Sequence, residues 1–262
     1  MISYIEQYYT EFRNEELRFV SNSGKVEYLT TLKYIEKYLK SGAKILEVGA
    51  GTGQYSLYLS RRGFDVTAIE LVEKNIERFK SKLMPNDQIQ IIKENALDLS
   101  QFEKDSFDII LILGPMYHLF TQADMLRALT EAKRILNPQG VMMVDYIMNE
   151  PTIVQWGLPN QAKNLKSVKT MEMLTEDFHC LSQEKDIFQM VRIKEIDELN
   201  RLAQLEREKI IATDLFTHYL DSTIDAYDEE TFQLYLDYHF SVCEREELIG
   251  VSNHVLDIIN KQ

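Results

Sequence analysis

Three glycines alternate over five positions within the stretch KILEVGAGTGQYSLYL, residues 44–59. Gly49, Gly51 and Gly53 follow an apolar run and precede a pattern typical of a helix. Glycines let a strand turn tightly into a helix, and they let a ligand approach the backbone without a Cβ in its way. The N–H groups at the start of such a helix suit a negatively charged group. An acid, Glu47, stands just before the turn, so the ligand must tolerate a carboxylate nearby.

Three kinds of ligand use a glycine turn between the first strand and helix of an α/β sheet. A nucleoside triphosphate needs G-x-x-x-x-G-K-[ST], and no Lys-Ser or Lys-Thr follows these glycines. A dinucleotide prefers G-x-G-x-x-G, but the sixth position is Gln54 or Ser56 in the two possible frames, which disfavours this ligand without excluding it. S-adenosylmethionine fits best, because the N–H groups suit its carboxylate and Glu47 suits its cationic groups.

The stretch ILEVGAGTG resembles motif I of the class I S-adenosylmethionine-dependent methyltransferases, whose pattern is hhE/DhGxGxG. The resemblance implies a Rossmann-like methyltransferase fold with S-adenosylmethionine as the cofactor, and it covers roughly residues 40–148. Within motif I it implies cofactor-binding roles for Glu47, Gly49, Ala50, Gly51 and Gly53. The alternative for the glycines is a tight turn without a ligand.

Further along the chain, the resemblance implies contacts with the rest of the cofactor. Glu70 ends the second expected strand, where the family has an acid that grips both ribose hydroxyls, and Leu71 beside it would cover the adenine. A carboxylate is a good acceptor for two adjacent hydroxyls. Asn95 stands where the family often has an aspartate for the adenine amino group, and Ala96 would offer its backbone N–H to the ring. Tyr55, just inside the first helix, would reach the methionine carboxylate.

The segment GPMYHL, residues 114–119, follows the fourth expected strand, where the family places catalytic or substrate-facing residues. The segment also looks like one found in a subgroup of stand-alone bacterial methyltransferases. Gly114 is expected to bind the cofactor. His118 has a suitable unperturbed pKa for a general base, and its alternative role is a structural histidine that bonds a loop carbonyl. Tyr117 would line the methyl channel or pack under the cofactor. We expect His118 and Tyr117 to be the catalytic residues.

These residues need a scaffold that brings them to one edge of a sheet. Between residues 44 and 148, short apolar runs alternate with helical patterns. Such alternation predicts βαβ units, and runs that are apolar at every position indicate parallel strands covered on both faces. The expected fold is α/β and Rossmann-like, with a mostly parallel seven-stranded sheet, helices on both faces and a helical lid. Strands are expected at 44–48, 65–70, 88–95, 107–113 and 140–147, and helices at 54–62, 72–83 and 122–136.

The whole chain is expected to form a single domain. Residues 40–148 would be the cofactor-binding core, residues 1–39 and 149–192 a lid on the acceptor side, and residues 193–262 the closing helices and strands. The closing part reads as helix 193–208, strand 209–214, helix 229–246 and strand 253–259.

The N-terminus carries four aromatic residues on one face of an expected helix: Tyr4, Tyr8, Tyr9 and Phe12. This face either packs on the core or forms a lid whose tyrosines hold an amine or stack on a ring.

Composition limits the class of protein. The chain has 262 residues, a net charge of −13 and two cysteines, which fits one substantial core in a reducing cytoplasm. We expect no membrane span and no signal peptide, because no apolar run is long enough and the start of the chain is acidic. A negative surface argues against nucleic acid as a partner. The histidines show no metal-ligand spacing, so no metal is expected.

The favoured function is an S-adenosylmethionine-dependent methyltransferase that transfers a methyl group to a small-molecule acceptor by in-line displacement. The lid-sized insertion after Met148 and the negative charge favour a small or cationic acceptor. The chain would act as a monomer or homodimer. The alternative is a non-catalytic module that binds S-adenosylmethionine or a nucleotide.

Overall fold

The computed structural model of the protein describes residues 3–157 and 165–261. Within them, one sheet has the strand order β3-β2-β1-β4-β5-β8-β7, and a two-residue strand, β6, lies beside β5. The first five strands run parallel, whereas β8 is antiparallel to both β5 and β7. This confirms the expected mostly parallel Rossmann-like sheet, in which β6 is an eighth strand beside the seven expected. The strands are β1 (Lys44–Val48), β2 (Asp65–Glu70), β3 (Ile89–Lys93), β4 (Phe107–Ile112), β5 (Leu136–Met148), β6 (Met190–Val191), β7 (Leu205–Ala212) and β8 (His254–Lys261).

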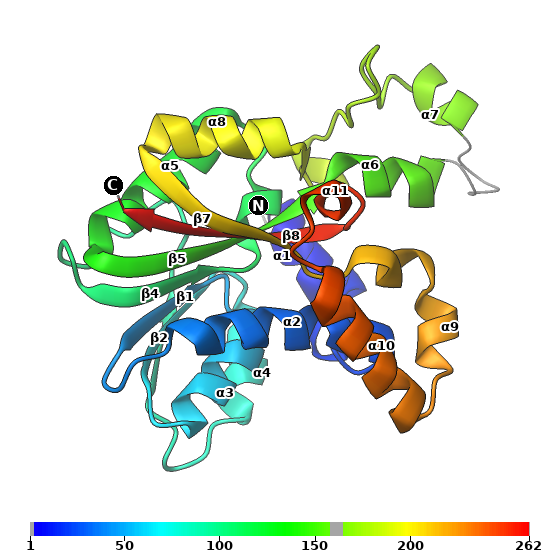
Figure 1. Cartoon of the computed structure of the whole chain (residues 1–262). Coiled ribbons are helices and arrows are strands. Elements are labelled where there is room, and N and C mark those ends of the chain that lie inside the picture. The colour runs from blue at the N-terminus through cyan, green and yellow to red at the C-terminus, as the bar shows by residue number, and fades with distance from the viewer. Residues whose placement is uncertain (1–2, 158–164, 262) are drawn as a thin grey trace.

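Helices cover both faces of the sheet. In Figure 1, α2, α3 and α4 lie below the sheet and α5 and α8 lie above it. The longer helices are α2 (Asn22–Tyr38), α3 (Gln54–Arg61), α4 (Glu73–Ser81), α5 (Gln122–Ile135), α8 (Ile193–Ala203) and α10 (Glu229–Val242). Polar side chains mark where some of them begin: the Ser21 hydroxyl accepts the Gly24 N–H at the start of α2, and the Thr121 hydroxyl accepts the Asp124 N–H at the start of α5.

Short helical turns connect these elements and lie mostly at the carboxyl edge of the parallel strands. They are α1 (Tyr4–Gln7), the π-helical turn η1 (Tyr8–Phe12), α6 (Asn149–Thr152), the π-helical turn η4 (Ile153–Gly157), α7 (Leu165–Thr170), α9 (Asp221–Asp225), α11 (Glu246–Ile249) and the 3-10 turns η2 (Glu15–Leu17), η3 (Pro115–His118), η5 (Glu184–Asp186) and η6 (Leu215–Tyr219). Part of the expected lid, residues 158–164, lies outside the described residues. None of the described helices is both long and apolar enough to cross a membrane.

The core runs through the centre of the sheet, where neighbouring strands are apolar along most of their length. Residues 109–112 of β4 are all buried, as are residues 45–48 of the adjacent β1, and helices cover them on both sides. A strand that is covered on both faces has no solvent-facing positions, which explains the unbroken apolar runs.

Several expected boundaries are wrong: β5 begins at Leu136 rather than at residue 140, and α10 ends at Val242 rather than at residue 246. One segment also has a different conformation from the one expected. The helix expected over residues 193–208 ends at Ala203, and Gln204 adopts the left-handed conformation with φ +53°. Residues 205–212 form β7 and pair with β8 from the C-terminal segment, which takes the place of the short strand expected at 209–214. Glu and Arg favour helices locally, but the pairing with a distant strand decides the conformation here.

Candidate active site

The glycine loop takes the conformation that its residue types require. Gly49 and Gly53 have φ values of +77° and +82°, in the left-handed region that favours glycine. A Cβ on Gly49 would lie 2.6 Å from the Pro115 ring, and one on Gly53 would lie 2.2 Å from the Phe79 ring. The loop therefore fits between α4 and the segment after β4 only because these side chains are absent, and this packing accounts for Gly49 and Gly53 with or without a ligand.

Glu70 joins the end of β2 to the glycine loop. One carboxylate oxygen accepts the Gly51 N–H at 2.7 Å, and the other accepts the Val72 N–H at 2.8 Å. The side chain of Asn75 lies 3.5 Å from the second oxygen. Burial raises the pKa of Glu70, while these hydrogen bonds oppose the rise. The carboxylate is thus held rigidly at the edge of a cavity, where hydroxyl groups of a ligand can reach it.

A cavity of about 350 Å³ lies at the carboxyl ends of β1, β2 and β4. It is the crevice in which open α/β sheets bind ligands. Nine of the residues predicted from the sequence line it: Gly49, Gly51, Glu70, Leu71, Asn95, Ala96, Gly114, Tyr117 and His118. We call it the cofactor cavity.

Four predicted cofactor residues lie outside this lining. Ala50 and Gly53 shape the loop from behind. Glu47 is 2% exposed and accepts a short hydrogen bond from the Ser56 hydroxyl at the start of α3. Burial raises the pKa of Glu47 to about 7, although the bonds from Ser56 oppose this. The predicted direct contact with cationic groups of the ligand is therefore replaced by a bond that ties β1 to α3.

Tyr55 also departs from its predicted role. Its ring is buried against the rings of Phe19 and Tyr28, with centroids 5.9 Å and 5.0 Å away. This aromatic cluster holds the N-terminal segment against α3, and Tyr55 is not among the residues that line the cofactor cavity.

Asn95, in the segment after β3, lines the cofactor cavity as expected, but the Asn95 side chain already accepts a hydrogen bond within the chain. The Asn95 side-chain oxygen accepts the Leu97 N–H at 2.9 Å, which closes a small turn. The neighbouring Glu94 lines the cavity as well. Sequence reasoning gave Glu94 no role, since only the Asn95 position matched the family pattern.

His118 lies in the cofactor cavity with both ring nitrogens bonded. Its Nδ1 lies 2.9 Å from the Ile187 carbonyl oxygen, so this nitrogen carries the proton, because a carbonyl can only accept. Its Nε2 then accepts the hydroxyl of Tyr9 at 3.0 Å. Burial lowers the pKa of His118 to about 4. The structure thus combines the expected location with the alternative role, a histidine bonded to a loop carbonyl.

Two charged residues of the N-terminal segment, Glu15 and Arg18, also line the site, and no sequence pattern predicted them. Arg18 lies 3.3 Å from Glu15, 3.2 Å from the Tyr117 hydroxyl and 2.6 Å from Glu27. Glu15 passes over the glycine loop, 3.5 Å from where a Gly51 Cβ would be. These contacts connect residues up to 99 positions apart, and no local pattern could have revealed them.

The aromatic N-terminus does not pack its apolar face on the core as a unit. Tyr9 is turned inward to His118, whereas Tyr4 and Phe12 are 53% and 73% exposed. Tyr8 packs edge-on against Phe188, with ring centroids 5.7 Å apart. The N-terminal segment therefore covers the cofactor cavity, which it lines through Ser3, Tyr4, Ile5, Tyr9, Glu15 and Arg18.

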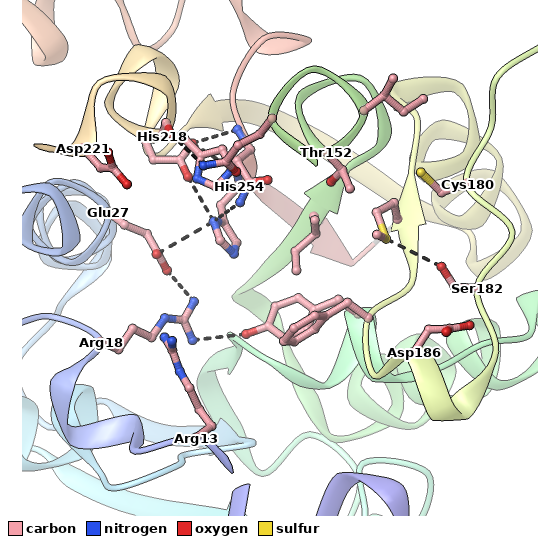
Figure 2. Close-up of a pocket in the computed structure, with 18 of the residues that line it drawn as sticks. Arg13, Arg18, Glu27, Thr152, Cys180, Ser182, Asp186, His218, Asp221 and His254 are labelled. Atoms are coloured by element: carbon pink, nitrogen blue, oxygen red, sulfur yellow. Dashed lines mark hydrogen bonds and ion pairs between the residues drawn. The ribbon is translucent and has the colours of Figure 1, made fainter. Parts of the chain in front are cut away.

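A second and larger cavity, of about 810 Å³, shares lining residues with the first and so lies beside it. Figure 2 shows part of the lining of this larger cavity. We call it the acceptor cavity. It is lined by apolar side chains of the segment after β5, by the aromatic residues Tyr8 and Phe188, and by polar groups of α2, η6 and β8. Tyr9, Glu15, Arg18 and Tyr117 line both cavities and form a common wall between them.

Comparison with known proteins agrees with this geometry. Residues 46–144 match a family model described as a methyltransferase domain. A demethylmenaquinone methyltransferase of Staphylococcus aureus is 32% identical over 118 residues, which are 44% of this chain and 47% of that protein. A Methanocaldococcus jannaschii protein, provisionally named as a ribosomal RNA large subunit methyltransferase, is 29% identical over 121 residues, 44% of this chain and 31% of that protein. The chain thus spans less than half the length of either relative.

A solved structure extends the likeness to most of the chain. The S-adenosylmethionine-dependent methyltransferase of Methanosarcina mazei superposes with a TM-score of 0.57 at 17% identity, covering 87% of this chain and 96% of that one. At this identity the likeness concerns the fold. The expected fold is thereby confirmed, and residues 46–144 of the chain match a methyltransferase domain within it.

Proposed function

We propose that the protein transfers the methyl group of S-adenosylmethionine to a small molecule bound in the acceptor cavity. The observation that supports this most directly is the common wall between the two cavities. Methyl transfer is an in-line displacement, in which the accepting atom must lie about 3–3.5 Å from the methyl carbon. The shared residues show that the two cavities adjoin, and a passage between these side chains would let the methyl carbon and the accepting atom meet.

Different residues of the cofactor cavity would contact different parts of S-adenosylmethionine. Glu70 would accept both ribose hydroxyls, and Leu71 would cover the adenine. Asn95 and Ala96 would contact the adenine edge. Gly49, Gly51 and Gly114 would leave room for the methionine part beside the backbone. Glu47, Ala50, Gly53 and Tyr55 would support this arrangement from behind without touching the cofactor.

We assign His118 a positioning role rather than that of a general base. Both of its nitrogens are bonded, and its depressed pKa makes it a weak proton acceptor at neutral pH. It would fix the hydroxyl of Tyr9 in the common wall. Tyr9 and Tyr117 are then the side chains that would contact the methyl group or the accepting atom.

A small acceptor is favoured over RNA by two features. The acceptor cavity is lined by the N-terminal segment and by segments that follow β5, and its volume of about 810 Å³ suits a small molecule. The chain carries a net charge of −13, which disfavours a phosphate backbone. Proteins with a matching domain include one named for ribosomal RNA, so RNA belongs in the test as a competing acceptor.

The test is turnover. The full chain is incubated with S-adenosylmethionine and a panel of metabolites, and formation of S-adenosylhomocysteine is followed; ribosomal RNA forms a separate arm. We expect methylation of at least one small molecule, and Gly51→Val should abolish it because the new side chain would stand in the cofactor cavity. Methylation of RNA alone would refute the small-molecule acceptor. S-adenosylhomocysteine binding without any turnover would favour the non-catalytic module.

A further inference from the structure

Two residues in the lining of the acceptor cavity each have a buried polar atom without a partner. The atoms are Oε1 of Gln155, in η4, and Nε2 of His218, in η6, and neither makes a hydrogen bond to any described residue. Buried polar groups are nearly always paired in native proteins. Unpartnered atoms on a cavity wall therefore mark a place where a ligand supplies the missing hydrogen bonds.

The orientation of the Gln155 amide follows from its other hydrogen bond. Its Nε2 donates to the backbone carbonyl oxygen of His218 at 3.0 Å, and a carbonyl can only accept, so the amide cannot be turned over without losing this bond. The same bond places the Gln155 amide next to η6. The free atom of the Gln155 side chain is thus an acceptor, which needs a hydrogen-bond donor on the ligand.

Hydroxyl groups elsewhere in the lining already have partners within the chain. The Thr152 hydroxyl donates to the Met148 carbonyl oxygen at 3.0 Å, and the Thr217 hydroxyl bonds the Tyr235 hydroxyl at 2.8 Å. The two unpartnered atoms are therefore exceptions within this lining rather than typical of it.

His218 is uncharged at neutral pH, because burial lowers the pKa of its ring. Asp221, Glu27 and His254 lie at the same end of the acceptor cavity (Figure 2), and their charges, with that of Asp214, act on this pKa. A neutral imidazole nitrogen either donates or accepts, depending on which nitrogen carries the proton. His218 therefore adds a second hydrogen-bonding atom next to Gln155 but no charge.

The buried carboxylates near His218 already have cationic partners. Burial opposes a charge on His254, yet the surrounding carboxylates raise its pKa to about 9, so it is protonated at neutral pH and pairs with Asp214 at 3.0 Å. Glu27 lies 2.6 Å from the guanidinium of Arg18. A charged group of a ligand would thus find no buried counter-ion of its own here, which favours a neutral polar group.

The segments that follow β5 give much of the acceptor cavity an apolar lining. These side chains are Ile153, Val168, Met173, Leu174, Leu181 and Met190. Gln155 and His218 line the acceptor cavity alone, whereas Tyr9 and Tyr117 belong to the common wall. A ligand whose accepting atom lies at the common wall would therefore meet Gln155 and His218 with a different part of its structure.

We infer that the methyl acceptor is an apolar molecule with a hydroxyl group, which Gln155 and His218 recognise at the end away from the accepting atom. This inference rests on the proposed function. A hydroxyl both donates and accepts, so it can donate to the Gln155 oxygen and serve His218 with either ring nitrogen protonated. A carboxylate or an ether has no proton to donate, and it would leave the Gln155 oxygen unpaired, which lowers its affinity.

Binding of two probes of similar shape tests the inference. With S-adenosylhomocysteine bound to the full chain, 4-ethylphenol and 1-ethyl-4-fluorobenzene, in which fluorine replaces the hydroxyl, are titrated at neutral pH by calorimetry. We expect the phenol to bind about tenfold or more tightly than the fluoro compound. Gln155→Leu should remove most of this preference and leave the affinity for the fluoro compound nearly unchanged. Gln233→Leu, which removes an exposed amide of α10, is the matched control and should keep the preference.

Several results would overturn the inference. Equal affinity for the two probes would do so, as would no binding of 4-ethylphenol. An unchanged preference in Gln155→Leu would show that the hydroxyl is bound elsewhere; if that variant does not fold, His218→Phe is measured against the same criterion. Tighter binding of 4-ethylbenzoate than of 4-ethylphenol would replace the hydroxyl by an anion. Failure of S-adenosylhomocysteine to bind the wild-type chain would instead refute the proposed function.

Discussion

Replacing Glu70 by glutamine tests two roles of its carboxylate separately: support of the glycine loop and binding of the ribose. In the structure its two oxygens accept the Gly51 and Val72 N–H groups, at 2.7 Å and 2.8 Å. A glutamine has one acceptor oxygen, so one of these N–H groups loses its partner. A buried donor without a partner costs about 1–3 kcal/mol. For a chain of this size, each kcal/mol lowers Tm by roughly 2–4 °C, and a thermal melt without ligand measures this loss.

The cofactor should respond separately. If Glu70 grips the ribose, Glu70→Gln removes a charge-assisted hydrogen bond of about 1.5–3 kcal/mol. The affinity for S-adenosylhomocysteine, measured by calorimetry, should then fall by roughly 10- to 150-fold. Glu77→Gln, an exposed acid on α4, is the matched control and should bind like the wild type.

A double-mutant cycle excludes an indirect effect through the glycine loop. The affinities of both proteins are measured for S-adenosylhomocysteine and for its 2′-deoxy analogue, which lacks one ribose hydroxyl. If the carboxylate contacts that hydroxyl, the penalty of the variant should shrink by about tenfold with the analogue. An equal penalty for both ligands would refute the contact and leave Glu70 as a support for the loop alone.

Three further predictions concern the loop and the common wall. Gly53→Ala should lower the free energy of unfolding by roughly 1–2 kcal/mol through left-handed backbone strain and by about 1–3 kcal/mol more through overlap with Phe79. Gly42→Ala, at φ +77° with no atom within 4 Å, should lose only the part due to strain. Denaturant unfolding of both variants measures the difference. Burial lowers the pKa of His118 to about 4 in the folded chain, so between about pH 6.5 and pH 4 only the unfolded chain binds a proton at this histidine. The free energy of unfolding of the wild type should therefore fall as the pH falls through this range, and His118→Asn should lack this part of the loss. Tyr9→Phe should slow methyl transfer about tenfold or more with unchanged folding; an unchanged rate would remove its hydroxyl from the mechanism.

The sequence predicted the parallel half of the fold because its signals are local. Apolar runs, glycines and helical periodicity all lie within a few residues of the elements that they specify, as at β1 and the loop of Gly49. The end of α8 was misplaced for the opposite reason. Residues 204–208 favour a helix when taken alone, and their strand conformation depends on pairing with β8, about fifty residues further along the chain.

In the candidate site, too, local motifs could be predicted and long-range contacts could not. Glu70 and the glycines could be placed because a motif fixes their position relative to the strands. The orientation of His118 could not be predicted, because the Ile187 carbonyl 69 residues away determines it. Arg18 and Glu27 were missed entirely, since the N-terminal segment meets the sheet only in the folded chain. Predictions from motifs thus find the cofactor side of the site more readily than the acceptor side.

The position of β8 has a consequence for how the chain acquires its structure during synthesis. In the sheet, β7 pairs with β8 and with no other described strand. Residues 205–212 leave the ribosome first, and 41 residues lie between Ala212 and His254. At about 5–20 residues per second, the earlier segment waits roughly 2–8 s for its partner. An unpaired strand invites aggregation, and charged residues counteract this. The charges in LEREKIIA therefore protect the nascent chain for those seconds, and they go on protecting the free edge of β7 in the finished sheet.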